Sequence, residues 1–195
     1  MSYPLTQTLD LYRVVIIFGA ISGLIATWSI STAIAASEIE LALPISTFYS
    51  VLGLALGFNN VITAAYAGFG LHLLTGMILG SIISVLVVKF KKTTLMNPYK
   101  GMIVGIGAGI AIWLVFFLPI TALLIQPSLD RIVMLSAIGT QKPILSDNIN
   151  KDITGIAISA IVFHIIWGAI FGFVSSSLLR IKAAKGKGKI QGQLQ

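Results

Sequence analysis

The chain has 195 residues, of which 56% are hydrophobic and 10% charged, and it carries a net charge of +7. Ordinary soluble domains contain roughly a quarter charged residues, so this chain has too few polar side chains to cover a soluble protein. It has no cysteine, which excludes disulfides, thiolate metal sites and cysteine nucleophiles. The composition therefore indicates an integral membrane protein.

Four apolar stretches are each long enough for a membrane-spanning helix, which needs about 20 residues. They cover residues 13–37, 66–88, 102–125 and 153–179, all approximate bounds. We predict an all-α membrane protein with one transmembrane domain over residues 1–182. Pro119 lies inside the third stretch and is expected to kink that helix. The remaining residues, 183–195, are basic, rich in glycine and without periodicity, which is typical of a disordered tail.

The stretch EIELALPISTFYSVLGLALG, residues 38–57, allows two interpretations. It is apolar enough to be a fifth span, but a further crossing would place Lys89, Lys91 and Lys92 outside the membrane, against the positive-inside rule. Pro44 and the polar residues that follow it favour an interfacial or re-entrant helix in the first outer loop. We predict a helix that does not cross.

The basic residues are distributed unevenly along the four-span topology. Ten of the thirteen would lie on one side of the membrane: Arg13, Lys89, Lys91, Lys92, Lys100, Arg180, Lys182, Lys185, Lys187 and Lys189. The positive-inside rule makes that side cytoplasmic, so we predict a multi-pass protein of the cell membrane with both termini inside. Beside a bilayer, the basic tail is expected to bind anionic lipid, at about 1 kcal/mol per basic residue, and not nucleic acid.

Two strings in the spans are closely similar: HLLTGMILG at 72–80 and HIIWGAIFG at 164–172. Each has a histidine followed by glycines at the fourth and eighth positions after it. Spans one and three also match, because each has two glycines four residues apart and then a tryptophan, at Trp28 and Trp113. The pattern predicts two helical hairpins related as a parallel repeat, with a pseudo-twofold axis along the membrane normal.

Residues four apart lie above one another on a helix, so the glycines form stripes. Such stripes allow two helix backbones to approach closely in lipid. We predict helix packing by Gly19, Gly23, Gly76, Gly80, Gly105, Gly109, Gly168 and Gly172.

The histidines, His72 and His164, need a partner, because an unpaired imidazole is costly in hydrocarbon. The simpler hypothesis is a hydrogen bond to another helix, through Ser22, Thr27, Ser29 or Thr121. The functional hypothesis is a polar or proton site with the two imidazoles facing each other. Two histidines are an incomplete metal site, which Met77, Glu38, Glu40, Asp147 or Asp152 would have to complete. No cofactor is predicted.

The H-x-x-x-G-x-x-x-G string in a four-span chain resembles small, uncharacterised prokaryotic four-helix membrane proteins. This resemblance covers spans two and four and implies no activity and no binding residue. Small helical subunits of membrane enzymes such as copper-dependent monooxygenases have a similar build, although no residue here marks one. All six acidic residues lie outside the spans, which counts against a proton-coupled pump.

No set of catalytic residues is visible in the sequence, so we do not predict an enzyme. We expect an accessory or structural subunit of a membrane complex, or a homo-oligomer. The alternative is a small channel or carrier with its pathway between the two repeats, near the histidines.

Overall fold

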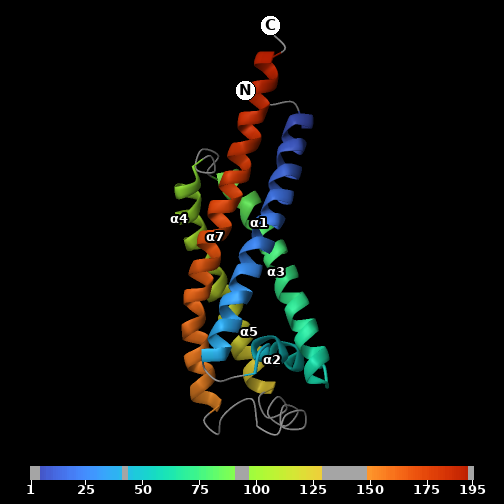
Figure 1. Ribbon diagram of the computed structural model, residues 1–195, viewed down its shortest axis with the longest axis vertical. Coiled ribbons are helices and arrows are strands. Elements are labelled where there is room, and N and C mark those ends of the chain that lie inside the picture. Colours follow the sequence, from blue (N-terminus) through green and yellow to red (C-terminus); the bar gives the residue numbers. More distant parts are fainter. Residues whose placement is uncertain (1–4, 41–43, 91–96, 129–148, 193–195) are drawn as a thin grey trace. The chain divides into compact units, whose positions relative to one another are not determined.

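The computed structural model describes residues 5–40, 44–90, 97–128 and 149–192, and all regular structure in these ranges is helical. The long helices are α1 (Leu5–Glu40), α3 (Val61–Phe90), α4 (Pro98–Ile112) with its continuation to Ser128, and α7 (Ile149–Gly192) (Figure 1). Four helices in the described part are long and apolar enough to cross a membrane, as the sequence predicts. The candidate spans are Asp10–Glu40, Val61–Phe90, Pro98–Ser128 and Ala160–Ala184.

Two of the spans are capped at their N-terminus by an asparagine side chain. The Oδ1 atom of Asn60 accepts hydrogen bonds from the backbone N–H groups of Ile62 and Thr63, at 3.0 and 3.1 Å. Asn97 does the same for the two residues after Pro98. The first N–H groups of a helix have no partner within it, so these caps fix where α3 and α4 start.

The stretch that allowed two interpretations forms the short helix α2 (Thr47–Ala55). Its nine residues extend about 14 Å at 1.5 Å per residue, which is less than half the hydrocarbon thickness of about 30 Å. The helix stops at Ala55, and Gly57 beyond its C-cap has a φ of 106°, a conformation that glycine adopts without a steric penalty. The N–H groups of Gly57 and Phe58 bond to the carbonyls of Leu54 and Gly53, which is a Schellman ending.

The buried carboxylate of Glu38 holds the start of α2. One of its oxygens accepts the N–H of Ser46 and the other accepts the N–H of Phe48, both at 2.7 Å. Glu38 is 5% exposed, so each of these charge-assisted bonds is shielded from solvent. Both oxygens are therefore engaged by backbone, which argues against the hypothesis that Glu38 is a metal ligand.

The third span changes its helical form around Pro119. Two π-helical turns, η2 (Trp113–Phe117) and η3 (Thr121–Ile125), flank the short α5 (Leu118–Ile120) that contains this proline. In η2 the N–H of Leu118 bonds to the carbonyl of Trp113, five residues back. Pro119 has no N–H to donate to the carbonyl four residues earlier, and a wider turn accommodates that missing bond.

The last helix is longer than the sequence predicts. We expected residues 183–195 to be a disordered tail, but α7 continues to Gly192. Adding a residue to an existing helix costs far less than starting one. The spanning helix can therefore extend through AAKGKGKIQG despite its glycines, which the composition alone does not reveal.

The chain divides into two compact units, and the division crosses the long helices. Unit 1 comprises Met1–Thr27, Thr75–Gly109 and Ile165–Gln195, and unit 2 comprises Trp28–Leu74 and Ile110–His164. Unit 1 thus contains the first part of α1 and of α4, and the last part of α3 and of α7. Successive spans therefore run in opposite directions within this unit. Its apolar core includes Val15 and Val88, with partly buried Tyr12, Val85, Val87 and Leu179 around them.

Candidate functional site

In unit 1, the glycines of α1 and α3 lie backbone to backbone. A Cβ atom added to Gly23 would overlap the carbonyl of Gly76, and one added to Gly19 would be 2.6 Å from the carbonyl oxygen of Gly80. No side chain fits between the two helices at these positions. We call this contact the first glycine seam.

A second glycine seam joins α4 to α7 within the same unit. A Cβ on Gly105 would overlap the carbonyl of Gly168, and a Cβ on Gly172 would overlap the carbonyl of Gly101. Gly101 is absent from the predicted packing residues, although its spacing of four from Gly105 could have identified it. Gly109 is buried in α4.

The contacts of the two seams also correct the alignment of span one with span three. Gly19 and Gly23 correspond to Gly101 and Gly105, one helical turn earlier than the sequence pattern places them. In each seam a serine follows the second glycine by four residues and lies against the partner glycine, Ser84 against Gly19 and Ser176 against Gly101. The repeated string is therefore H-x-x-x-G-x-x-x-G-x-x-x-S.

A buried hydrogen bond also connects α1 to α7 in unit 1. The indole Nε1 of Trp167 donates to the Oγ1 of Thr27 at 2.8 Å, and that hydroxyl donates to the carbonyl of Gly23. Trp167 lies between His164 and Gly168 in the repeated string, where the first copy has Thr75. The two copies therefore differ at the position that makes this bond.

The two histidines lie in unit 2, where an aromatic ring contacts each. The Nδ1 atom of His164 is 2.7 Å from the carbonyl oxygen of Ala160 in its own helix. Its ring packs edge-on against Phe117, with centroids 5.0 Å apart. Phe117 ends the π-helical turn η2, so the altered stretch of the third span contacts this histidine.

His72 packs against α2. Its ring centroid is 5.9 Å from that of Phe48 and 5.5 Å from that of Tyr49. Its Nε2 atom is buried and has no hydrogen-bond partner among the described residues. A buried ring nitrogen without a partner is costly.

The hydroxyls proposed as histidine partners bond elsewhere. Ser22, Thr27 and Thr121 each donate to the carbonyl four residues earlier in their own helix, at 2.7 to 2.9 Å. Side-chain hydroxyls in apolar helices commonly bond in this way. Thus the structure brings the histidines to aromatic rings and a backbone carbonyl instead of to these side chains.

Tyr49 connects α2 to its surroundings. Its ring contacts Phe69 at 5.2 Å, and Phe69 in turn contacts Trp28 at 5.9 Å. The hydroxyl lies near Ser31 but makes no bond of hydrogen-bond geometry with any described residue. Burial raises the pKa of this phenol, the neighbouring Ser31 opposes the rise and the charge of Glu38 adds to it.

Replacing Tyr49 by phenylalanine is expected to leave stability at neutral pH unchanged or slightly raised, since the lost hydroxyl is buried without a bond. A tyrosine whose folded-state pKa is raised contributes stability below its unfolded value of about 10 and loses it as the pH rises further. Thermal unfolding in detergent between pH 7 and pH 11 measures both effects. The alkaline loss should be smaller in Tyr49→Phe than in the wild type, and an equal loss would show that another group titrates.

No metal site is visible in the part of the chain that the structure describes, because no three His, Cys, Asp or Glu side chains converge there. Asp147 lies outside the described residues. This chain matches no protein-family model, no curated protein and no solved structure. The two glycine seams and the histidine–aromatic cluster of His72, His164, Phe48, Tyr49 and Phe117 are therefore interpreted from their own chemistry.

Proposed function

We propose that this chain is a non-catalytic, multi-pass protein of the cell membrane with both termini in the cytoplasm. The distribution of charge between the units supports this topology. Unit 1 contains ten basic residues and one acidic residue, whereas unit 2 contains three basic and five acidic residues. Under the positive-inside rule, the ends of the spans that belong to unit 1 lie on the cytoplasmic side. The basic end of α7 then lies where it can bind anionic lipid.

The four spans form two repeated hairpins in this proposal, α1 with α3 and α4 with α7. The two glycine seams support it, since each pairs two glycines of one helix with two glycines of the next and adds a serine one turn later. In this proposal α2 belongs to the first outer loop, and the charge distribution supports that assignment. There it would be an interfacial or re-entrant helix, because it is too short to cross.

The chain acts in this proposal as an accessory subunit of a membrane complex or as a homo-oligomer. The main support for this assembly is the exposure of the third span. Only 6% of the most apolar window of Pro98–Ser128 is buried, compared with 22% to 39% in the other spans. On this helix Gly107 is exposed with no atom within 4 Å of an added Cβ, and Ala111, four residues later, is exposed as well. Small residues at this spacing allow another helix to approach.

Native mass measurement in mild detergent tests the assembly. We expect species heavier than the 20.8 kDa chain, either multiples of it or a complex with other subunits. Gly107→Trp should reduce their proportion, because its side chain would fill the approach surface. Gly70→Trp is the matched control, since Gly70 on α3 is likewise open. A stable lone monomer, also after extraction from the native membrane, would contradict the proposal.

The second candidate is a small channel or carrier whose pathway passes the histidine–aromatic cluster. The buried, unpartnered Nε2 of His72 favours it, as do the π-helical turns beside His164, because π turns are frequent at functional sites. Polar groups inside a membrane protein often mark a pathway.

Proton flux into liposomes containing the purified protein, followed with an enclosed pH dye, tests the second candidate. The wild type should conduct, and the double variant His72→Leu with His164→Leu should not. Met77→Leu, a half-buried change on the same helix, serves as the control. Equal flux in the folded double variant, or none in the wild type, rejects a proton pathway through the histidines.

A further inference from the structure

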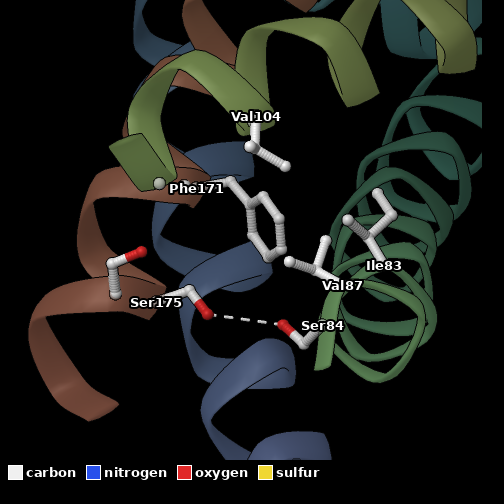
Figure 2. A pocket seen from close by; sticks show the side chains of 10 residues that line it. Ile83, Ser84, Val87, Val104, Phe171 and Ser175 are labelled. Atoms are coloured by element: carbon white, nitrogen blue, oxygen red, sulfur yellow. Dashed lines mark hydrogen bonds between the residues drawn. The ribbon is translucent and has the colours of Figure 1, made fainter. Parts of the chain in front are cut away.

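A small pocket lies in unit 1 where α3, α4 and α7 meet, and it is partly open at the surface of the unit. Its rim is formed by half-buried side chains, Ile83 and Val87 from α3 and Val104 from α4. Its floor is the ring of Phe171 from α7, which is 3% exposed. Figure 2 shows this ring between Val104 and Val87. The pocket therefore offers aliphatic and aromatic carbon to whatever enters it.

The two hydroxyls beside the ring are already bonded to each other. The oxygens of Ser84 and Ser175 are 3.4 Å apart, as the dashed line in Figure 2 marks, and each residue is 2% exposed. A buried water needs two to four polar partners, whereas an apolar cavity stays dry and takes apolar molecules. The volume of about 10 Å³ is room for one small group. The pocket is thus suited to a single methylene or methyl group of a longer apolar molecule.

Two lysines lie just beyond the pocket, at the ends of the spans that line it. Lys100 precedes Val104 by four residues, so both lie on the same face of α4, about 6 Å apart along its axis. On α3, Phe90 follows Val87 by three residues and shares its face. The Nζ atom of Lys89 lies over the ring of Phe90, 5.8 Å from its centroid, which is a cation–π contact. This contact holds the Lys89 ammonium toward the side of α3 that lines the pocket.

No carboxylate on these helices neutralises the two lysines. α3 and the parts of α4 and α7 in unit 1 contain no aspartate or glutamate, and the one acidic residue of the unit, Asp10, belongs to α1. Both lysines are exposed. Tyr99, next to Lys100, is 71% exposed, and tyrosine at the end of a span is typical of the level of the lipid head groups. The pocket therefore opens below a positive charge at head-group level.

We propose that this pocket and the two lysines bind an anionic phospholipid. Its phosphate lies between Lys89 and Lys100, and the first carbons of one acyl chain place a methylene group against Phe171. Basic pockets between spanning helices on the cytoplasmic side recognise such head groups, and the apolar pocket adds a contact that free phosphate cannot make. The site rests on the membrane topology of the proposed function, but it requires no partner subunit and is separate from the basic end of α7.

Native mass spectrometry of the purified protein with added phosphatidylglycerol tests the head-group contact. Phosphatidylcholine with the same acyl chains, which has no net charge, is the comparison lipid. The wild type should retain one phosphatidylglycerol at concentrations where phosphatidylcholine is lost. Binding should be about fivefold weaker in Lys89→Gln or in Lys100→Gln, the usual effect of one basic residue near a membrane. Lys182→Gln is the matched control, because this exposed lysine lies over Phe18 of α1 and should not affect binding.

A second pair of variants tests the acyl chain. Val104→Phe should also weaken phosphatidylglycerol binding, because its larger side chain fills the pocket while both lysines remain. Ile103→Phe is the control, since Ile103 is 67% exposed and does not line the pocket. Glycerol phosphate, which carries the charge without a chain, should not displace the lipid.

Equal retention of the two lipids by the wild type would overturn the proposal, as would unchanged binding in the double lysine variant or in Val104→Phe. Displacement by glycerol phosphate would reject the acyl-chain contact and with it the site. Circular dichroism shows whether each variant is folded, and Ile83→Phe fills the pocket from α3 if Val104→Phe does not fold. The same spectra report assembly separately: a lone monomer with bound lipid would contradict the accessory role and leave this site standing.

Discussion

Replacing Gly80 by alanine is expected to lower the free energy of unfolding by about 3 kcal/mol, the upper end of the usual cost of overpacking. The new Cβ would overlap the carbonyl of Gly19 and stand 2.9 Å from the Cα of Gly23. Backbone atoms cannot turn aside as a flexible side chain can, so α1 and α3 must separate along the first glycine seam. Unfolding in detergent, followed by the loss of helical circular dichroism, measures the effect.

Gly70→Ala is the matched control for this prediction. Gly70 lies on the same helix, and no atom is within 4 Å of its added Cβ. The substitution should leave stability unchanged or raise it by up to about 1 kcal/mol, since alanine has the higher helix propensity. Gly172→Ala should match Gly80→Ala, because it meets the carbonyl of Gly101 in the second glycine seam. Equal stability of Gly80→Ala and Gly70→Ala would mean that the seam does not hold the two helices together.

Replacing Glu38 by alanine is expected to release α2 from its position. The change removes both acceptors for the N–H groups of Ser46 and Phe48, and hydrogen bonds to a charged group contribute about 1.5–3 kcal/mol each. Ser46 has a φ of 75°, an uncommon conformation for a residue with a side chain. Once the carboxylate is removed, these bonds no longer hold Ser46 in that conformation.

Amide hydrogen exchange over Thr47–Ala55 measures this release. Exchange should be faster in Glu38→Ala, with an intermediate rate in Glu38→Gln, which keeps one oxygen as an acceptor. Glu40→Gln is the control, because Glu40 is exposed two residues further along α1. Unchanged exchange in Glu38→Ala would show that aromatic packing alone, through Phe48 and Tyr49, holds α2 in place.

The positions of the spans could be predicted from the sequence because they depend on a local property. A run of apolar residues of sufficient length forms a helix in lipid whatever its neighbours are. The prediction that residues 38–57 do not cross the membrane came from charge counting along the chain and from Pro44 with the polar residues after it, and neither requires a tertiary contact. α7 extends past the predicted span to Gly192, because adding residues to an existing helix costs less than starting a new one.

The glycine seams show where sequence reasoning stops. The spacing of four identified seven of the eight glycines now seen to pair across the two seams, but it could not say which helix each would meet. Gly101 was missed at the polar start of span three, and the alignment of spans one and three was one turn out. Only the pairing of backbones resolves such a shift, since every fourth residue lies on the same stripe.

The histidine–aromatic cluster could not be predicted, because its contacts correspond to no pattern in the sequence. His72 meets Phe48 and Tyr49 from α2, and His164 meets Phe117 from the π-helical turn. Serine and threonine hydroxyls looked suitable as partners by polarity. Ser22, Thr27 and Thr121 instead bond to their own helices, because a carbonyl four residues earlier is always within reach.

By itself, the sequence determined that this is an all-helical membrane protein with four spans, glycine stripes and an uneven charge. These properties follow from solvation by lipid and from helical periodicity, which act along a single segment. The tertiary structure decided which glycines face each other, how Glu38 fixes α2 and where the histidine rings pack. Those features depend on atoms far apart in the chain coming within a few ångströms, and close packing permits that at only a few positions.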